Sequence, residues 1–128
     1  MKTIFLKGIT LFMLLLFTSF TLLAQNAKDI IGKWKDKDHP DKQIEMYVQG
    51  TDKYEAKMIN DTRKKSQNGL IIFKNLSWNE AKRIYQGILI NPDDGNEFKI
   101  NIELVNKDTF QFKIKRMFLT KTFQFVRI

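Results

Sequence analysis

Apolar and polar residues alternate with a period of two along most of the chain after residue 30. This pattern is typical of β-strands that bury one face. It is clearest in residues 98–104 and 110–114, and weaker runs of the same kind cover residues 43–48, 54–60, 70–74, 84–91 and 122–128. Trp34 begins the series, so we expect about eight strands.

Short polar breaks separate these runs, at residues 38–41, 49–52, 92–95 and 106–108. They are rich in the Asp, Asn, Gly and Pro residues that favour turns, and short turns join antiparallel neighbours. Only residues 27–31 and 78–83 are suited to a helical turn. The sequence therefore predicts an all-β fold, a small antiparallel up-and-down barrel of about eight strands, with a partly open β-sandwich as the alternative.

The first 24 residues have the layout of a secretory signal peptide. Lys2 and Lys7 precede an uncharged apolar run, and the chain becomes polar after Ala24. We expect cleavage after Ala24, with Ala27 as the second candidate, and a single domain over residues 25–128. An uncleaved membrane anchor is the rival interpretation, because about 20 apolar residues can span a bilayer.

Export and charge together limit the partners. The chain has 22 basic and 14 acidic residues, so loss of Lys2 and Lys7 leaves a net charge of about +6. Such a protein favours anionic partners, and in the periplasm or outside the cell these are envelope surfaces rather than nucleic acid. The chain has no cysteine, so its stability must come from packing and hydrogen bonds without a disulfide.

One pair of residues is selected by strand parity. If Phe123 and Phe125 point inward, Arg127 lies on the same inner face. In a closed meander the first strand pairs with the last, so Trp34 is the expected partner for a cation–π contact of about 0.5–2 kcal/mol. The alternative is that Arg127 leaves the end of the barrel and meets solvent.

The segment Ile31-Gly32-Lys33-Trp34, together with Arg127, resembles the structural signature of the calycin superfamily, which includes lipocalins. The order of the further motifs is similar to a family of small exported bacterial proteins of unknown function with a lipocalin-like domain. Those motifs are a Gly-x-Trp start, Asn68-Gly69-Leu70, Gln86-Gly87-Ile88, the Asn-Pro-x-x-Gly segment at residues 91–95, and Phe125-Val126-Arg127. The resemblance implies a fold and an export route, and it implies no activity.

No catalytic, cofactor or metal motif stands out. His39 is the one histidine, and it lies beside Pro40 in a predicted turn, away from any serine in a strand-to-helix elbow. Asp93, Asp94 and Glu97 lack the spacing of a calcium loop, and a β-turn explains the segment better. We therefore expect no enzyme, no cofactor and no metal site.

Two groups of basic residues are the candidate contacts for an anionic ligand or surface. They are Arg63, Lys64 and Lys65 in a long loop, and Lys113, Lys115, Arg116 and Lys121 in the last hairpin. Lysines that only keep strand faces soluble are the alternative explanation.

Methionines 46, 58 and 117, with the many phenylalanines, predict an adaptable apolar interior. The first functional hypothesis is an exported binding module for a small apolar or amphiphilic ligand, whose acidic head group meets Arg63 to Lys65. The second is a structural or interaction protein of the cell envelope, with a filled core and a basic outer surface.

Overall fold

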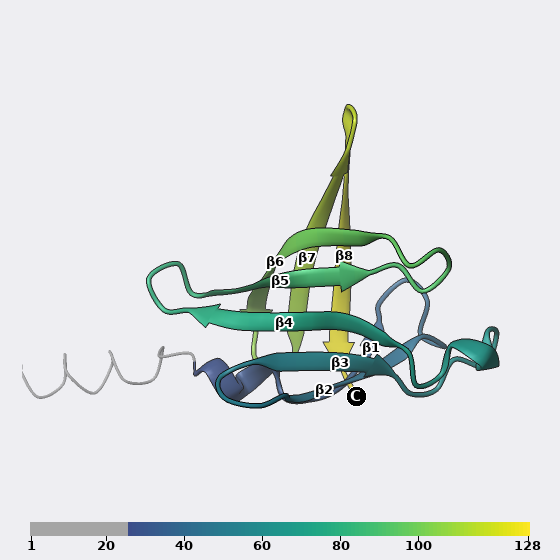
Figure 1. The fold of residues 1–128 in the computed structure, drawn as a ribbon, viewed down its shortest axis with the longest axis horizontal. Helices are drawn as coiled ribbons and strands as arrows, with labels where there is room; N and C mark the ends of the chain where they lie inside the picture. Colours follow the sequence, from purple (N-terminus) through teal and green to yellow (C-terminus); the bar gives the residue numbers. More distant parts are fainter. Residues whose placement is uncertain (1–25) are drawn as a thin grey trace, which may run out of the picture.

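A computed structural model describes residues 26–128 of the chain. These residues form one closed antiparallel barrel in which each strand pairs with the next and β8 returns to β1 (Figure 1). The elements in chain order are η1 (Ala27–Ile30), β1 (Gly32–Asp36), β2 (Gln43–Val48), β3 (Tyr54–Met58), η2 (Lys65–Gln67), β4 (Ile71–Asn79), β5 (Ile84–Ile90), β6 (Glu97–Asn106), β7 (Thr109–Arg116) and β8 (Leu119–Arg127). The all-β barrel is therefore confirmed, and the open sandwich is not formed.

The predicted strands all occur, with differences at their ends. β4 continues through Trp78 and Asn79, and the expected helical turn at residues 78–83 is instead a tight turn at its far end, where Arg83 has a φ of 56°. The other candidate, residues 27–31, does contain the short helix η1. The predicted signal peptide, residues 1–24, lies outside the described residues, and no helix within residues 26–128 has the length and apolar character to cross a membrane.

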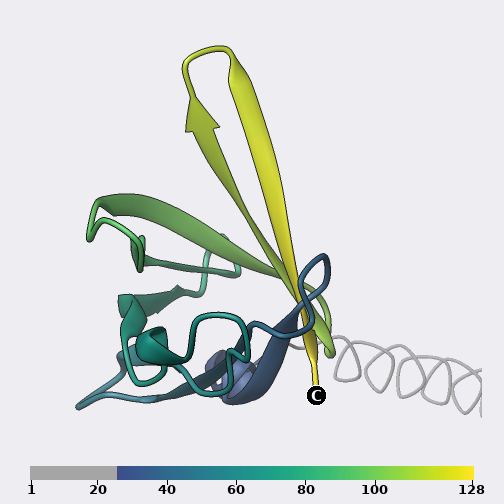
Figure 2. The same ribbon diagram turned by 90° about the vertical axis from the view of Figure 1, so that its right-hand side faces the viewer.

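The barrel is paired tightly along only part of its length. β6 and β7 pair from Asn106↔Thr109 to Glu103↔Gln111, and β8 pairs with β1 over Phe125 to Arg127. Beyond those pairs β7 and β8 continue as a two-stranded ribbon to the pair Arg116↔Leu119. This ribbon leans away from β6, as Figure 2 shows. One end of the barrel is thus closed, and the other diverges.

The helix η1 covers the closed end. Asn26 caps it by accepting a hydrogen bond from the Lys28 N–H, and Asp29 accepts one from the Asn26 N–H in return. Ile30 at its end is fully buried, and the hydroxyl of buried Tyr85 donates to the Ala27 carbonyl. Capping and burial together hold a helix that is too short to be stable by itself.

Arg127 joins four separate segments at this end. Its Cζ lies 4.1 Å from the centroid of the Trp34 ring. Its Nη atoms donate to the carbonyls of Ile31 at 2.9 Å, Asp29 at 2.6 Å and Lys107 at 3.1 Å. Trp34 in turn donates from Nε1 to the Ile30 carbonyl at 2.9 Å. The planar guanidinium therefore binds η1, the start of β1 and the β6–β7 turn to the last strand.

The same guanidinium explains why residue 32 is a glycine. Gly32 has a φ of +137°, which side chains rarely adopt, and a Cβ added there would lie 2.7 Å from Nη1 of Arg127. The Gly-x-Trp segment is thus one unit, in which Gly32 leaves room for the arginine that covers Trp34.

We expect Gly32→Ala to lower the free energy of unfolding by about 2–4 kcal/mol, because a strained φ and an overpacked contact add together. Gly50→Ala is the matched control: Gly50 also has a positive φ, of +72°, but has no neighbour within 4 Å of the added Cβ. It should cost about 1–2 kcal/mol. Urea unfolding measures both, and equal losses would contradict a steric role for Arg127.

A double-mutant cycle tests the Trp34–Arg127 contact itself. Trp34→Leu removes the ring face, and Arg127→Met removes the charge while it keeps most of the side-chain length. We expect a coupling energy of about 1–2 kcal/mol in urea unfolding, because the contact combines a cation–π interaction with shared positioning of η1. Additive losses would show that the two side chains stabilise the closed end independently.

Candidate functional site

A cavity of about 390 Å³ opens at the diverging end of the barrel. Its lining residues come from β4, β5 and β6 on one side and from the β7–β8 ribbon on the other. Figure 2 shows how this ribbon leans away from the other strands. Most of its lining is apolar, and it includes Ile72, Phe73, Leu89, Pro92, Phe98, Phe112, Ile114, Leu119, Phe123 and Phe125. Its volume falls within the range of about 300–1,000 Å³ that small-molecule sites occupy.

A stack of aromatic rings forms the floor of this cavity. Phe110 contacts Trp34 edge-on at 4.8 Å between centroids, and it stacks on Phe125 at 5.0 Å. Phe112 stacks in turn on Phe123 at 5.2 Å, at the level where the lining begins to open. The interior is therefore filled by side chains on the Trp34 side and hollow on the other.

Three cationic side chains, Lys42, Arg116 and Lys121, line the mouth. The guanidinium carbon of Arg116 lies 5.5 Å from the ring centroid of Phe98, and Nζ of Lys121 lies 4.8 Å from that of Phe123. None of the three forms an ion pair with a carboxylate among residues 26–128. Apolar walls below positive charge suit a ligand with an apolar tail and an anionic head.

One carboxylate also faces this cavity. Asp36 occupies the inward position after Trp34 on β1 and is only 6% exposed. Its Oδ1 accepts hydrogen bonds from the N–H groups of Asp38, at 2.9 Å, and His39, at 3.2 Å. It orders the β1–β2 loop from which Lys42 reaches the mouth.

The predicted basic loop lies at the same end of the barrel but outside the cavity lining. Nε of Arg63 is 4.0 Å from Asp41, Nζ of Lys64 is 2.9 Å from Asp93, and Lys65 begins the exposed helix η2. Two of these cations are thus paired with exposed acidic side chains. Their role toward an anionic ligand stays a prediction, while the structure places Lys42, Arg116 and Lys121 directly at the mouth.

Buried Asp61 shapes this loop, and sequence reasoning did not single it out. Its Oδ1 accepts from the N–H groups of Arg63 and Lys64, and its own N–H donates to Oδ1 of Asn68 at 2.8 Å. Burial alone would raise the pKa of Asp61. The two backbone donors and the nearby charges of Arg63 and Lys42 outweigh burial, so the pKa is lowered.

The remaining residues considered for catalysis or metal binding lie in turns and loops. Asn91 closes the β5–β6 turn by accepting from the Asp93 N–H, and Gly95 takes a φ of 76° there. His39 is exposed in the β1–β2 loop. Among residues 26–128, no group of three or more His, Asp or Glu side chains is arranged to hold a metal ion.

One interior prediction was wrong. Met46 and Met58 are buried as expected, but Met117 is 91% exposed at the tip of the β7–β8 ribbon. Strand alternation stops at the turn, where Met117 has a φ of 51°. That conformation costs a side-chain-bearing residue about 1–2 kcal/mol.

These features define a lipocalin-like barrel with one closed end and one open, cation-rimmed cavity. Comparison with known proteins agrees on the fold. The chain is similar to protein HP1028 of Helicobacter pylori, which is described as belonging to the lipocalin family, with a TM-score of 0.58 and 19% identity over 77% of this chain and 82% of that one.

The chain belongs to a family described as uncharacterized protein conserved in bacteria, DUF2147, whose model matches residues 32–127. The match therefore runs from Gly32 to Arg127, two residues of the closed end. No curated protein sequence matches the chain.

We expect Asp61→Asn to lower the free energy of unfolding by about 1–2 kcal/mol at pH 6, because the anionic acceptor is lost. The lowered pKa means that the carboxylate stabilises the fold above its unfolded pKa of about 3.9 and loses this effect as the pH falls through its folded pKa. The difference from the unmodified protein should therefore shrink in urea unfolding at pH 3. Asp38→Asn, at an exposed position in the β1–β2 loop, should change the stability little at pH 6.

Proposed function

We propose that this chain is a non-enzymatic, exported binding protein. The cavity at the open end of its barrel holds the apolar tail of an amphiphile with an acidic head group. The observation that carries the proposal is the combination of an apolar cavity of about 390 Å³ with three cations at its mouth. Because packing at the closed end stabilises the barrel, side chains need not fill the open end.

The apolar walls support the tail. Phe73, Phe112 and Phe125 at the floor are at most 4% exposed, and Leu89 and Phe98 face them from β5 and β6. Each CH₂ group that moves from water into such a cavity is worth about 0.8 kcal/mol. A tail of several carbons therefore supplies most of the affinity.

The mouth supports the acidic head. Ile114↔Lys121 and Arg116↔Leu119 are paired across the ribbon, so a cation and an apolar side chain alternate along its inner face. Lys42 reaches the cavity from the β1–β2 loop. A carboxylate or phosphate at the mouth would gain charge-assisted hydrogen bonds while its tail lies below.

The alternative function, a structural or interaction protein of the envelope with a filled core, has less support inside the barrel. The excess of basic residues in the sequence is compatible with it, but the interior is filled only up to the level of Phe112. The cavity favours the binding module.

Export through cleavage after Ala24 is part of the proposal, and the closed end supports that position over the one after Ala27. Cleavage after Ala27 would remove Asn26, the cap of η1, and Ala27, whose carbonyl accepts from Tyr85. Cleavage after Ala24 keeps both. The domain would then lie in the periplasm or outside the cell.

The test uses two probes with the same tail and opposite charge, dodecanoate and dodecyltrimethylammonium, each below its micelle-forming concentration. We expect dodecanoate to bind at least tenfold more tightly in calorimetric titration at pH 8, since one favourable charge contact of about 1.4 kcal/mol gives that factor. Combined Lys42→Gln, Arg116→Gln and Lys121→Gln should abolish the preference.

The matched control is combined Arg63→Gln, Lys64→Gln and Lys65→Gln, which removes the same net charge from the loop outside the cavity. This variant should keep the preference for dodecanoate. Equal effects of the two triple variants would show that only net charge matters. If neither probe binds, and native mass spectra are the same before and after organic extraction, the cavity is not a ligand site.

A further inference from the structure

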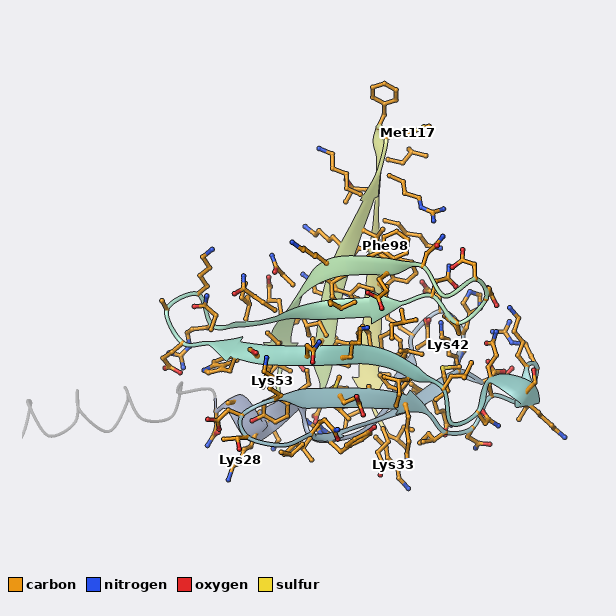
Figure 3. All side chains as sticks on the ribbon, viewed as in Figure 1. Lys28, Lys33, Lys42, Lys53, Phe98 and Met117 are labelled. Atoms are coloured by element: carbon orange, nitrogen blue, oxygen red, sulfur yellow. The ribbon has the colours of Figure 1, made fainter. Side chains whose placement is uncertain are left out.

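The tip of the β7–β8 ribbon is the most exposed apolar surface of the described residues. Met117 is 91% exposed, Phe118 100% and Leu119 79%. The other large apolar side chains on the surface are at most 59% exposed. Figure 3 shows Met117 at the far end of the ribbon, well beyond Phe98 of the barrel.

The tip is also an unusual choice for a hairpin turn. A two-residue turn joins Arg116 to Leu119, and its first residue, Met117, has a φ of 51°. Glycine is the residue that fits such a position without strain. The chain instead places two large apolar side chains there, in a conformation that disfavours one of them, which indicates a use for the tip outside the fold.

The charge around the tip has one sign. Residues 109–128 contain no Asp or Glu, and Lys113, Lys115, Arg116 and Lys121 flank the apolar tip. Lys113 and Lys115 are exposed, and neither of them lines the cavity or its mouth. The tip of the ribbon is thus apolar, and the charged side chains that flank it are all positive.

We infer that the ribbon docks on an anionic lipid bilayer, with Met117 and Phe118 inserted among the head groups and the flanking cations bound to lipid phosphates. An apolar tip flanked by Lys and Arg matches the two attractions that such a surface offers. A second copy of the chain is a poorer occupant, because two ribbons would bring the same positive charges together.

The geometry links docking to the cavity. Leu119 and Lys121 belong both to the ribbon near its tip and to the lining of the cavity mouth. A ribbon whose tip lies in the bilayer surface therefore holds the mouth beside the lipid head groups. An amphiphile can then pass between bilayer and cavity over a short distance.

The experiment uses co-flotation of residues 25–128 with vesicles of phosphatidylcholine alone and of phosphatidylcholine with phosphatidylglycerol. We expect binding to the anionic vesicles only, weakened when the salt is raised from 0.1 to 0.5 M, since the screening length falls well below 10 Å. The combined change Met117→Gly and Phe118→Asn should weaken binding at least tenfold. Lys113→Gln with Lys115→Gln should weaken it roughly 25-fold, at about fivefold for each cation.

The tip variant separates docking from folding. Glycine adopts the positive φ of position 117 without strain. The midpoint of thermal unfolding of the tip variant should therefore equal or exceed that of the unmodified protein. Val48→Asn with Val105→Asn is the control for exposed apolar surface elsewhere, since these side chains are 46% and 48% exposed, and it should bind as the unmodified protein does. Dodecanoate affinity should be unchanged in the tip variant, because Met117 and Phe118 do not line the cavity.

Three results would overturn the inference. One is no binding of the unmodified protein to anionic vesicles, and another is binding that the tip variant retains. The third is a concentration-dependent dimer, seen by analytical ultracentrifugation and lost in the tip variant, which would make the tip a contact between copies of the chain. Each of them leaves the amphiphile proposal to be judged by its own titration.

Discussion

The guanidinium of Arg127 over the indole of Trp34 is the contact on which the rest of the barrel depends. It joins the first and last strands, and its hydrogen bonds add η1 and the β6–β7 turn to the same point. These bonds supply partners for the carbonyl groups of Asp29 and Ile31, at the end of a short helix. Because this end is fixed, β7 and β8 can leave the barrel wall at the other end and still start from a defined position.

The interior has two parts with different tasks. Near Trp34 the rings pack edge-on, with Phe73 in contact with both Phe110 and Phe112, and Phe110 stacks face to face on Phe125. Beyond them the strands diverge faster than side chains can fill the space, and the cavity results. A chain of this size has few residues with which to build both a core and a pocket. In this barrel the packed core and the pocket lie one after the other along the barrel axis, which allows both.

Strand parity predicts most of this structure, including two of the cations at the cavity mouth. It predicts the strands, the barrel and the inner position of Arg127, because the period of two is set by the backbone itself. The same parity puts Arg116 after Phe112 and Ile114, and Lys121 before Phe123, on the inner face. The density of charge along the chain does not distinguish them from the exposed Lys113 and Lys115. Lys42 and Asp61 lie in loops, where no period exists, so only the fold shows their places. The prediction that Met117 belongs to the core was wrong for the same reason, because Met117 lies in a turn.

The long reach of Arg127 along the chain also bears on how the barrel can close. Its contact with Ile31 spans 96 residues, so the barrel's seam cannot form until nearly the whole described domain is available. Hairpins such as β2–β3 and β7–β8 can pair early, since their partners are close along the chain. The β1–β8 seam has the greatest sequence separation of the barrel's strand pairings, so its closure has the greatest entropic cost. Until the seam forms, η1 has no barrel end to cover.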